Sequence, residues 1–120
     1  PTGHTGEEAQ GDNITGFEVL VGGSGNDRLT GNVTATTLFG GAGADSLLGN
    51  GSNDVLLGGT GANTASGGDG DADRLDGGAG NDTQFGEGGN DLQLGGAGND
   101  CISGGDGVDT VQGAEDIDTI

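Results

Sequence analysis

The chain has 120 residues but no tryptophan, tyrosine or methionine, and only three phenylalanines. Hydrophobic residues make up 28% of it, too little apolar side-chain mass for a thick two-layer core. Cys101 is the one cysteine, so no disulfide can form within the chain. No hydrophobic run approaches the roughly 18–20 residues that cross a bilayer as a helix, so no transmembrane segment is predicted. No basic N-terminal segment precedes an apolar stretch either, so no signal peptide is predicted.

Basic residues are almost absent. Two Lys/Arg residues stand against 20 Asp/Glu residues, which gives a formal net charge of -18. Such a chain is repelled by nucleic acid and by anionic membranes, and it attracts cations. Its charge and low hydrophobicity alone would predict disorder, and its 32 glycines raise the entropic cost of ordering the backbone. Folding therefore requires a source of stability other than hydrophobic burial.

What the chain does have is a nine-residue repeat. The repeat is strictest over residues 77–111, which read GGAGNDTQF, GEGGNDLQL, GGAGNDCIS and GGDGVDTV. Glycines recur at positions one, two and four, and aspartate recurs at position six. Less regular copies begin at Asn13, and one unit of ten residues, 67–76, predicts a bulge in its turn. Residues 1–12 match no repeat and are expected to form a polar lead-in, either flexible or a cap.

A period of nine fits neither an α-helix nor collagen. Six turn-forming residues and three extended ones make half a coil of a parallel β-solenoid, so units n and n+2 stack about 4.8 Å apart. We therefore predict an all-β parallel β-roll over residues 13–120, with two repeats per coil and about five to six coils. Side chains alternate along a strand, so position eight faces inward. The predicted thin core consists of Leu29, Leu38, Leu47, Leu56, Leu75, Ile102, Val111 and Ile120.

Gln84 and Gln93 occupy two of these inward positions. A buried amide needs hydrogen-bond partners. Either the two glutamines form hydrogen bonds across the core, or the register slips so that Phe85 and Leu94 turn inward. The sequence leaves both alternatives open.

The pattern GGxGxDxUx, in which U is a large apolar residue, resembles the haemolysin-type calcium-binding nonapeptide of repeats-in-toxin (RTX) proteins. The resemblance covers about residues 13–120, and ITGFEVLVGGSGNDRLTGN is similar to the start of such arrays in large secreted bacterial proteins. It implies a right-handed roll that binds several Ca²⁺ ions and is not itself catalytic. It also implies a secreted or cell-surface parent, exported by a type I secretion system, with this chain as an excerpt. That parent is expected to be a protease, lipase, epimerase, toxin or adhesin.

Stacking of alternate units aligns the position-six residues in two ladders, the second of which begins at Glu18. Carboxylates about 5 Å apart repel each other by roughly 1 kcal/mol in water and about 3 kcal/mol at an effective dielectric of 20. A hard divalent cation between them reverses the sign of the interaction. We expect no binding at Thr36 and weak binding at Asn63, so that calcium concentrates after residue 77. The predicted carboxylate ligands are Asp27, Asp45, Asp54, Asp73, Asp82, Asp91, Asp100, Asp109 and Asp118.

The resemblance adds backbone carbonyls to these ligands. They come from positions two and four of one turn and from positions one and three of the turn stacked on it. Glycine is favoured in such turns because the backbone adopts φ values that other residues avoid. The carbonyls implied are those of Gly23, Gly25, Gly40, Ala42, Gly78, Gly80, Gly95, Ala97, Glu87, Gly89, Gly104 and Asp106.

One sheet is predicted to carry an apolar stripe on its outer face. The stripe either packs on a neighbouring domain or partner, or consists of the scattered apolar residues common on protein surfaces. A calcium-binding folding module and a structural or adhesive spacer are therefore both open. No catalytic function is predicted, because the carboxylates form periodic ladders without an apolar pocket. The apolar stripe comprises Val19, Val21, Phe39, Val55, Leu57, Leu92 and Leu94.

Overall fold

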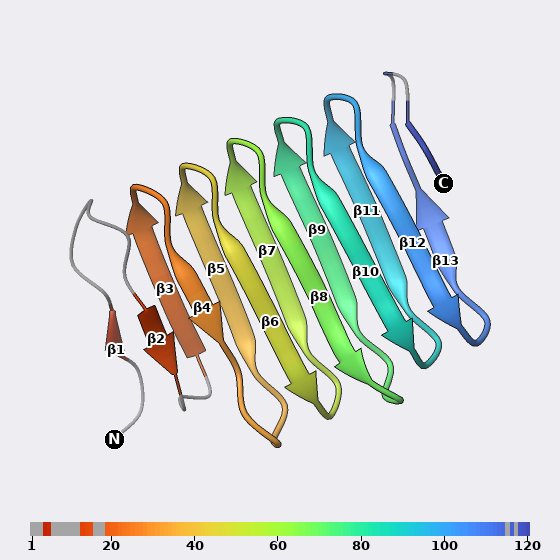
Figure 1. Cartoon of the computed structure of the whole chain (residues 1–120), viewed down its shortest axis with the longest axis horizontal. Coiled ribbons are helices and arrows are strands. Elements are labelled where there is room, and N and C mark those ends of the chain that lie inside the picture. Colours follow the sequence, from red (N-terminus) through yellow and green to blue (C-terminus); the bar gives the residue numbers. More distant parts are fainter. Residues whose placement is uncertain (1–3, 6–12, 16–18, 115, 117) are drawn as a thin grey trace.

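The computed structural model describes residues 4–5, 13–15, 19–114, 116 and 118–120. These residues form thirteen β-strands that alternate between two parallel sheets, and none of them belongs to a helix that could cross a membrane. Each coil contributes one strand to each sheet, and five complete coils run from β3–β4 to β11–β12 (Figure 1). The Cα atoms span only 14 Å along the shortest axis, so a single layer of side chains fits between the sheets. The predicted parallel β-solenoid is confirmed.

The odd-numbered strands form one sheet and the even-numbered strands form the other. The seven-stranded sheet contains, in spatial order, β1 (His4–Thr5), β3 (Val19–Ser24), β5 (Thr37–Ala42), β7 (Val55–Thr60), β9 (Arg74–Ala79), β11 (Leu92–Ala97) and β13 (Thr110–Gln112). The six-stranded sheet contains β12 (Cys101–Asp106), β10 (Thr83–Gly88), β8 (Thr64–Asp69), β6 (Ser46–Gly51), β4 (Arg28–Thr30) and β2 (Asn13–Thr15).

The register joins each unit to the next but one, as predicted. Leu20 lies opposite Leu38 in neighbouring strands of the seven-stranded sheet. The prediction of three-residue strands between six-residue turns is wrong, however, because most strands have six residues. Positions one to three continue the strand, and Gly41 keeps its pairing with Gly23 at a φ of 108°. Only positions four to six are left to turn the chain.

The core is a double row of leucines between the sheets. Leu20 and Ala65 extend the predicted row, and Val111 is half-buried. The prediction for Ile120 is wrong, since this side chain is 74% exposed. It follows β13, which pairs only with β11, and no described strand packs over that end. The buried hydrophobic residues are Leu20, Leu29, Leu38, Leu47, Leu56, Ala65, Leu75 and Ile102.

Gln84 and Gln93 are both fully buried, which confirms the first of the two alternatives. The Gln84 Nε2 donates to the carbonyl oxygen of Leu94 at 2.7 Å, and the Gln93 Nε2 donates to that of Ser103 at 3.1 Å. Each bond crosses the core to a strand of the opposite sheet. Both Oε1 atoms are buried without a hydrogen-bond partner. Phe85 is 40% exposed, so the register has not slipped.

The ten-residue unit keeps its extra residue in the turn, as predicted. Val55 pairs with Arg74 across the insertion, and the pairing of β9 with β11 resumes the usual spacing. The Asp71 carboxylate accepts a hydrogen bond from the Ser52 backbone N–H at 2.8 Å. The bulge therefore leaves the sheets in register.

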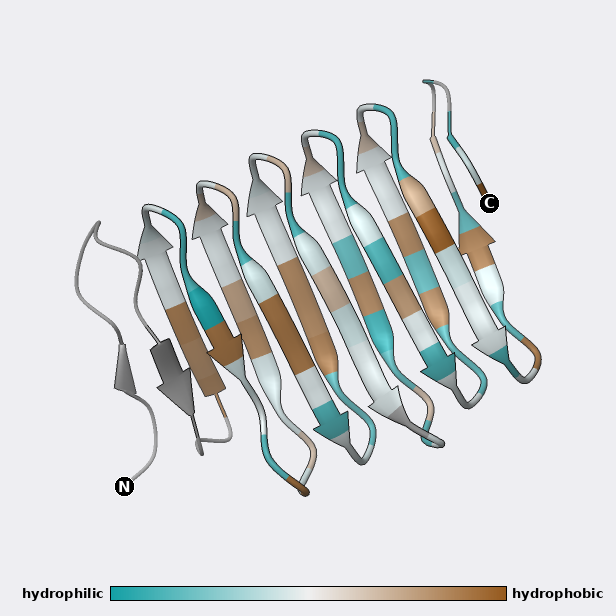
Figure 2. Ribbon diagram, viewed as in Figure 1, coloured by the Kyte–Doolittle hydropathy of each residue, from teal (hydrophilic) through white to brown (hydrophobic). Residues whose placement is uncertain are grey.

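The apolar stripe faces outward on the seven-stranded sheet. Val19 and Phe39 are its most exposed members, at 42% and 37%. Figure 2 shows mainly hydrophobic segments in β3 and β7, and alternation of hydrophobic with hydrophilic residues in β9 and β11. The Arg74–Asp76 ion pair, at 3.7 Å, interrupts the stripe at β9. A partner for the stripe stays a prediction.

Replacing both Gln84 and Gln93 with leucine should stabilise the folded roll by about 1–2 kcal/mol per residue, because each change removes an unpartnered buried oxygen. Chemical denaturation of the calcium-loaded protein measures the change. Gln112→Leu is the control, since Gln112 is exposed and should contribute nothing. If the double variant is less stable than the unmutated chain, the two hydrogen bonds across the core stabilise the roll by more than the unpartnered oxygens destabilise it.

Candidate metal centre

The turns that connect the two sheets carry the predicted aspartates, which are stacked in two ladders. Seven of the nine are only 1–4% exposed. Asp109 and Asp118, towards the C-terminal end, are half-buried, and Glu18 lies outside the described residues. One ladder follows the odd-numbered strands and consists of Asp27, Asp45, Asn63, Asp82, Asp100 and Asp118. The other follows the even-numbered strands and consists of Thr36, Asp54, Asp73, Asp91 and Asp109.

From Asp45 onwards, one oxygen of each ladder carboxylate accepts a hydrogen bond from a backbone N–H of the preceding turn in its ladder. The Asp82 N–H, for example, donates to Asp100 Oδ1 at 2.9 Å. This contact orients the side chain along the stack and leaves the other oxygen to point between the turns. Bonds of 2.7–3.1 Å fix the Oδ1 atoms of Asp45, Asp54, Asp73, Asp82, Asp91, Asp100, Asp109 and Asp118.

In several of these aspartates the other carboxylate oxygen, Oδ2, is buried without a hydrogen-bond donor. Removing a charged oxygen from water without a hydrogen bond or a counter-ion is strongly unfavourable. Among the residues that the structure describes, this arrangement occurs on both ladders. Buried Oδ2 atoms without a hydrogen-bond partner belong to Asp45, Asp54, Asp82, Asp91 and Asp100.

The first glycine of each unit provides the space into which Oδ2 points. A Cβ on Gly77 would lie 2.5 Å from Asp82 Oδ2 and 2.5 Å from the carbonyl oxygen of Gly95 in the next turn. A carboxylate oxygen and a carbonyl oxygen therefore approach the same point, and neither carries a hydrogen. The same pairing of oxygens occurs at Gly22, Gly40, Gly49, Gly67 and Gly86.

The carbonyls implied by the resemblance lie between stacked turns. Those at positions two and four face the backbone of the turn above, since a Cβ on Gly96 or Gly98 would collide with the carbonyl of Gly78 or Gly80. Those at position three accept backbone hydrogen bonds, as Ala97 does from the Gly80 N–H at 2.8 Å. A carbonyl has two lone pairs and can accept such a bond while also facing a cation. The full ligand set stays a prediction.

Burial raises the pKa of several ladder carboxyls above the ordinary 3.8. The effect is largest at Asp73, where burial raises the pKa to about 6 against the opposing hydrogen bond from the Asp54 amide. The neighbouring carboxylates, Asp54 first, add to the increase. Burial likewise raises the pKa values of Asp45, Asp54, Asp82 and Asp91. The negative charge that these carboxylates carry at neutral pH is therefore only partly compensated by the hydrogen bonds around them.

The donor set matches one class of ligand. Among the described residues, no three His, Cys, Asp or Glu side chains come close enough to hold a metal by themselves. The gaps beside the aspartates offer carboxylate oxygens together with main-chain carbonyls, and no histidine nitrogen or cysteine sulfur. Ca²⁺ prefers six to eight oxygen ligands in tolerant geometry, including backbone carbonyls. These residues fit calcium better than zinc or another transition metal.

Position five contributes a second set of contacts that the sequence analysis missed. The Asn81 Oδ1 accepts a hydrogen bond from the Asn99 N–H at 3.0 Å, and the Asn90 Oδ1 accepts one from the Val108 N–H at 2.9 Å. Asn26 makes the same contact with the Ala44 N–H. Asparagine recurs at position five of the repeat, so the amino-acid sequence carries a signal for these contacts. These bonds tie successive turns together without any charge.

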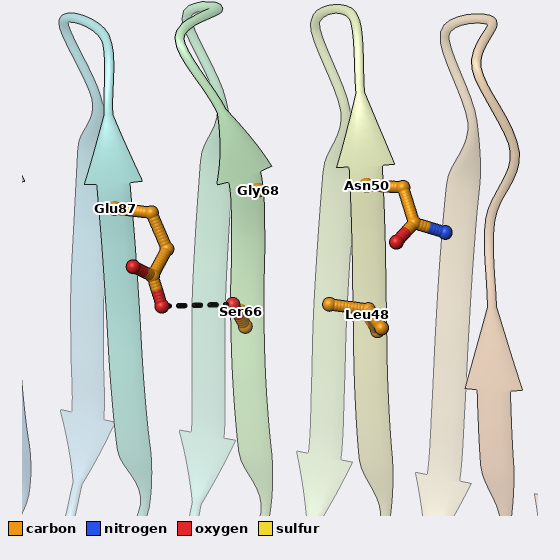
Figure 3. A pocket seen from close by; sticks show the side chains of 5 residues that line it. All are labelled: Leu48, Asn50, Ser66, Gly68 and Glu87. Atoms are coloured by element: carbon orange, nitrogen blue, oxygen red, sulfur yellow. Dashed lines mark hydrogen bonds between the residues drawn. The ribbon is translucent and has the colours of Figure 1, made fainter.

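A shallow hollow on the outer face of the six-stranded sheet is separate from the ladders. Gly68 lies between Asn50 and Glu87 in register and has no side chain to fill the gap (Figure 3). Leu48 and Ser66 form the rest of the lining, and the Ser66 hydroxyl donates to Glu87 Oε1 at 3.4 Å. The Glu87 side chain therefore points away from the acidic turns, although its carbonyl faces the next turn.

A comparison with protein families matches this chain to the RTX calcium-binding nonapeptide repeat, at residues 12–47, 34–65, 48–84, 58–93 and 85–120. The matches together cover most of the chain, which therefore belongs to this family of calcium-binding repeats. Neither the comparison with curated proteins nor that with solved structures found a match. The family binds Ca²⁺ at several sites, in agreement with the oxygen-lined gaps between the turns.

Replacing Gly77 with alanine should remove one calcium ion, because the new Cβ fills the space between Asp82 Oδ2 and the Gly95 carbonyl. Calorimetric titration measures the stoichiometry. Gly51→Ala is a matched control, since its Cβ would meet nothing closer than 3.9 Å and its φ is not positive. Equal calcium counts for the two variants would contradict this placement of the site.

The metal-free protein should become more stable as the pH falls from above about 6 towards 4. The folded pKa of Asp73, about 6, exceeds the unfolded value of 3.8, so its ionisation opposes folding as the pH rises through about 6. Circular dichroism in chelator between pH 4.5 and 7.5 tests this expectation. Asp73→Asn should flatten the profile, and an unchanged profile in that variant would contradict the assignment to Asp73.

Proposed function

We propose that this chain is the calcium-dependent folding module of a longer secreted protein and is not itself catalytic. The observation that supports it is the convergence of buried, unpartnered aspartate Oδ2 atoms with carbonyl oxygens between stacked turns. The nonapeptide unit, repeated from Asn13 to the C-terminal end, forms that module, and residues 1–12 lead into it.

The energetic argument begins with repulsion. Stacked turns bring carboxylates about 5 Å apart, which costs roughly 1–3 kcal/mol for each neighbouring pair, depending on the local dielectric. The net charge of -18 adds a general repulsion that the thin core does not offset. A Ca²⁺ ion bound between two turns supplies two positive charges against these oxygens. Since the unfolded chain holds no such site, binding free energy becomes folding free energy.

The same coupling suits export in an unfolded state. Calcium is scarce in the cytosol and abundant outside the cell, so the ladders would repel each other before export and be neutralised after it. The family implies a type I secretion system and an extracellular or cell-surface destination. The parent in this proposal is a protease, lipase, epimerase, toxin or adhesin, with the roll as its calcium-binding part.

A second candidate is a structural or adhesive spacer whose outer face binds a partner or surface. It is favoured by the apolar stripe, where Val19 and Phe39 are among the exposed large hydrophobic side chains. Size-exclusion chromatography of the calcium-loaded chain separates the candidates. Association that Phe39→Ser abolishes would favour the spacer, and a monomer would count against it.

Calcium should convert the chain from a largely unfolded state to a β-sheet structure, and chelation should reverse the change. Circular dichroism during a calcium titration measures it. Mg²⁺ is the control, because its preference for short octahedral coordination makes it a poor match to these turns. A chain with the same β-sheet spectrum in chelator as in calcium would contradict calcium-dependent folding.

A further inference from the structure

Two position-six residues, Asn63 and Thr36, are not carboxylates, and both are buried, at 3% and 2% exposure. We propose that their side chains donate a hydrogen bond in place of a cation, so that these two turns stack without calcium and hold the leucine-rich part of the roll together when calcium is absent. The inference rests on the proposed function and adds which part of the chain depends on the ion.

Asn63 keeps the part of the aspartate arrangement that orders the ladder. Its Oδ1 accepts a hydrogen bond from the Asp45 N–H at 2.8 Å, as the Oδ1 of Asp100 does from the Asp82 N–H at 2.9 Å. Its own N–H donates to Asp82 Oδ1 at 2.7 Å. Asparagine therefore replaces aspartate without disturbing the hydrogen bonds along the stack.

The difference lies at the other side-chain atom. A Cβ on Gly58 would lie 2.7 Å from Asn63 Nδ2 and would also meet the carbonyl of Gly77, so Nδ2 occupies the place that Oδ2 occupies elsewhere. Asn63 Nδ2 donates to the carbonyl of Gly61 at 3.3 Å. A donor now faces carbonyl oxygens where other turns bring oxygens together, and the repulsion is removed.

Thr36 reaches the same result on the other ladder with different chemistry. Its hydroxyl donates to the carbonyl of Thr34 at 2.8 Å, and its backbone N–H donates to Asp54 Oδ1 at 2.7 Å. Thr34 occupies position four of its unit, as Gly61 does in the Asn63 turn. Each turn therefore uses its own side chain to satisfy the carbonyl for which the family implies a calcium contact.

The hydrophobic core supports the same division of the chain. The continuous cluster of buried apolar residues runs from Leu20 to Leu75 and includes the strands on either side of both neutral turns. Beyond it, the inward positions begin with Gln84 and Gln93 and continue with the buried Ile102 and the half-buried Val111, and the turns carry the strict acidic repeat. Both neutral turns thus lie in the part of the roll that has the continuous apolar core, which also carries acidic turns at Asp45 and Asp54. In the part that follows, every position-six residue is an aspartate, and two of the inward residues are glutamines.

The discriminating pair of variants is Asn63→Asp and Asp82→Asn, neighbours on one ladder that exchange a neutral and a charged turn. We expect Asn63→Asp to bind one more calcium ion than the unmutated chain and to need a higher calcium concentration to fold. We expect Asp82→Asn to bind one fewer ion and to fold at a lower concentration. Native mass spectrometry counts the ions, and circular dichroism follows folding.

Several outcomes would overturn the inference while leaving the proposed function intact. In the first, the unmutated chain binds calcium but Asn63→Asp binds no additional ion. In the second, Asn63→Asp stays unfolded in saturating calcium. If the unmutated chain binds no calcium, the proposed function is refuted instead.

Hydrogen exchange in chelator supplies a second readout: the strands from β5 to β9 should be the most protected, and Thr36→Val should reduce that protection. Uniform exchange along the whole chain would also overturn the inference.

Discussion

Carboxylate and carbonyl oxygens meet between the stacked turns with no hydrogen to share, and the rest of the roll depends on how that contact is resolved. The first glycine of each unit leaves the space for it. Hydrogen bonds from backbone N–H groups to Oδ1 fix the direction of these carboxylates, so side-chain rotation cannot relieve the contact. The single layer of leucines is too thin to compensate for a ladder of unmatched charges.

The two ways of resolving the contact differ in what they demand of the surroundings. A bound cation requires a supply of the ion, and it makes the fold respond to that supply. An internal donor is always present, and it makes its turn independent of the ion. Both neutral turns lie beside the apolar core, together with some acidic ones, whereas every turn beside and after the buried glutamines is acidic. The roll therefore has parts of different character within one continuous pair of sheets.

Much of this architecture could be predicted from the period alone. Nine residues per unit specified parallel stacking of alternate units, and the position-eight residues specified the inward row from Leu29 to Leu75. The length of the strands could not be predicted, because glycine at position two suggests a turn. In the structure, Gly41 continues the strand and keeps its pairing with Gly23 at a positive φ. Ile120 was misplaced because periodicity says nothing about whether another strand packs over a given unit.

The candidate site was predicted to the level of residue type but not of individual atoms. The sequence marks Asp82 and Asp100 as neighbours, but only the structure separates the amide-bonded Oδ1 from the buried Oδ2. The sequence also could not show that Asn63 directs its side-chain N–H donor towards main-chain carbonyls of the turns. That direction depends on how the side-chain amide is oriented in the formed turn.

The ten-residue unit shows that strand pairing and turn length are independent in this fold. Its extra residue is taken up between β8 and β9, and the carboxylate of Asp71 bonds to the turn below it. The coils on either side remain in step, and the tip of this turn is exposed. Such tips are where chains tolerate added sequence. A longer loop, or even a separate folded unit, could be grafted at this edge without unwinding the coils around it.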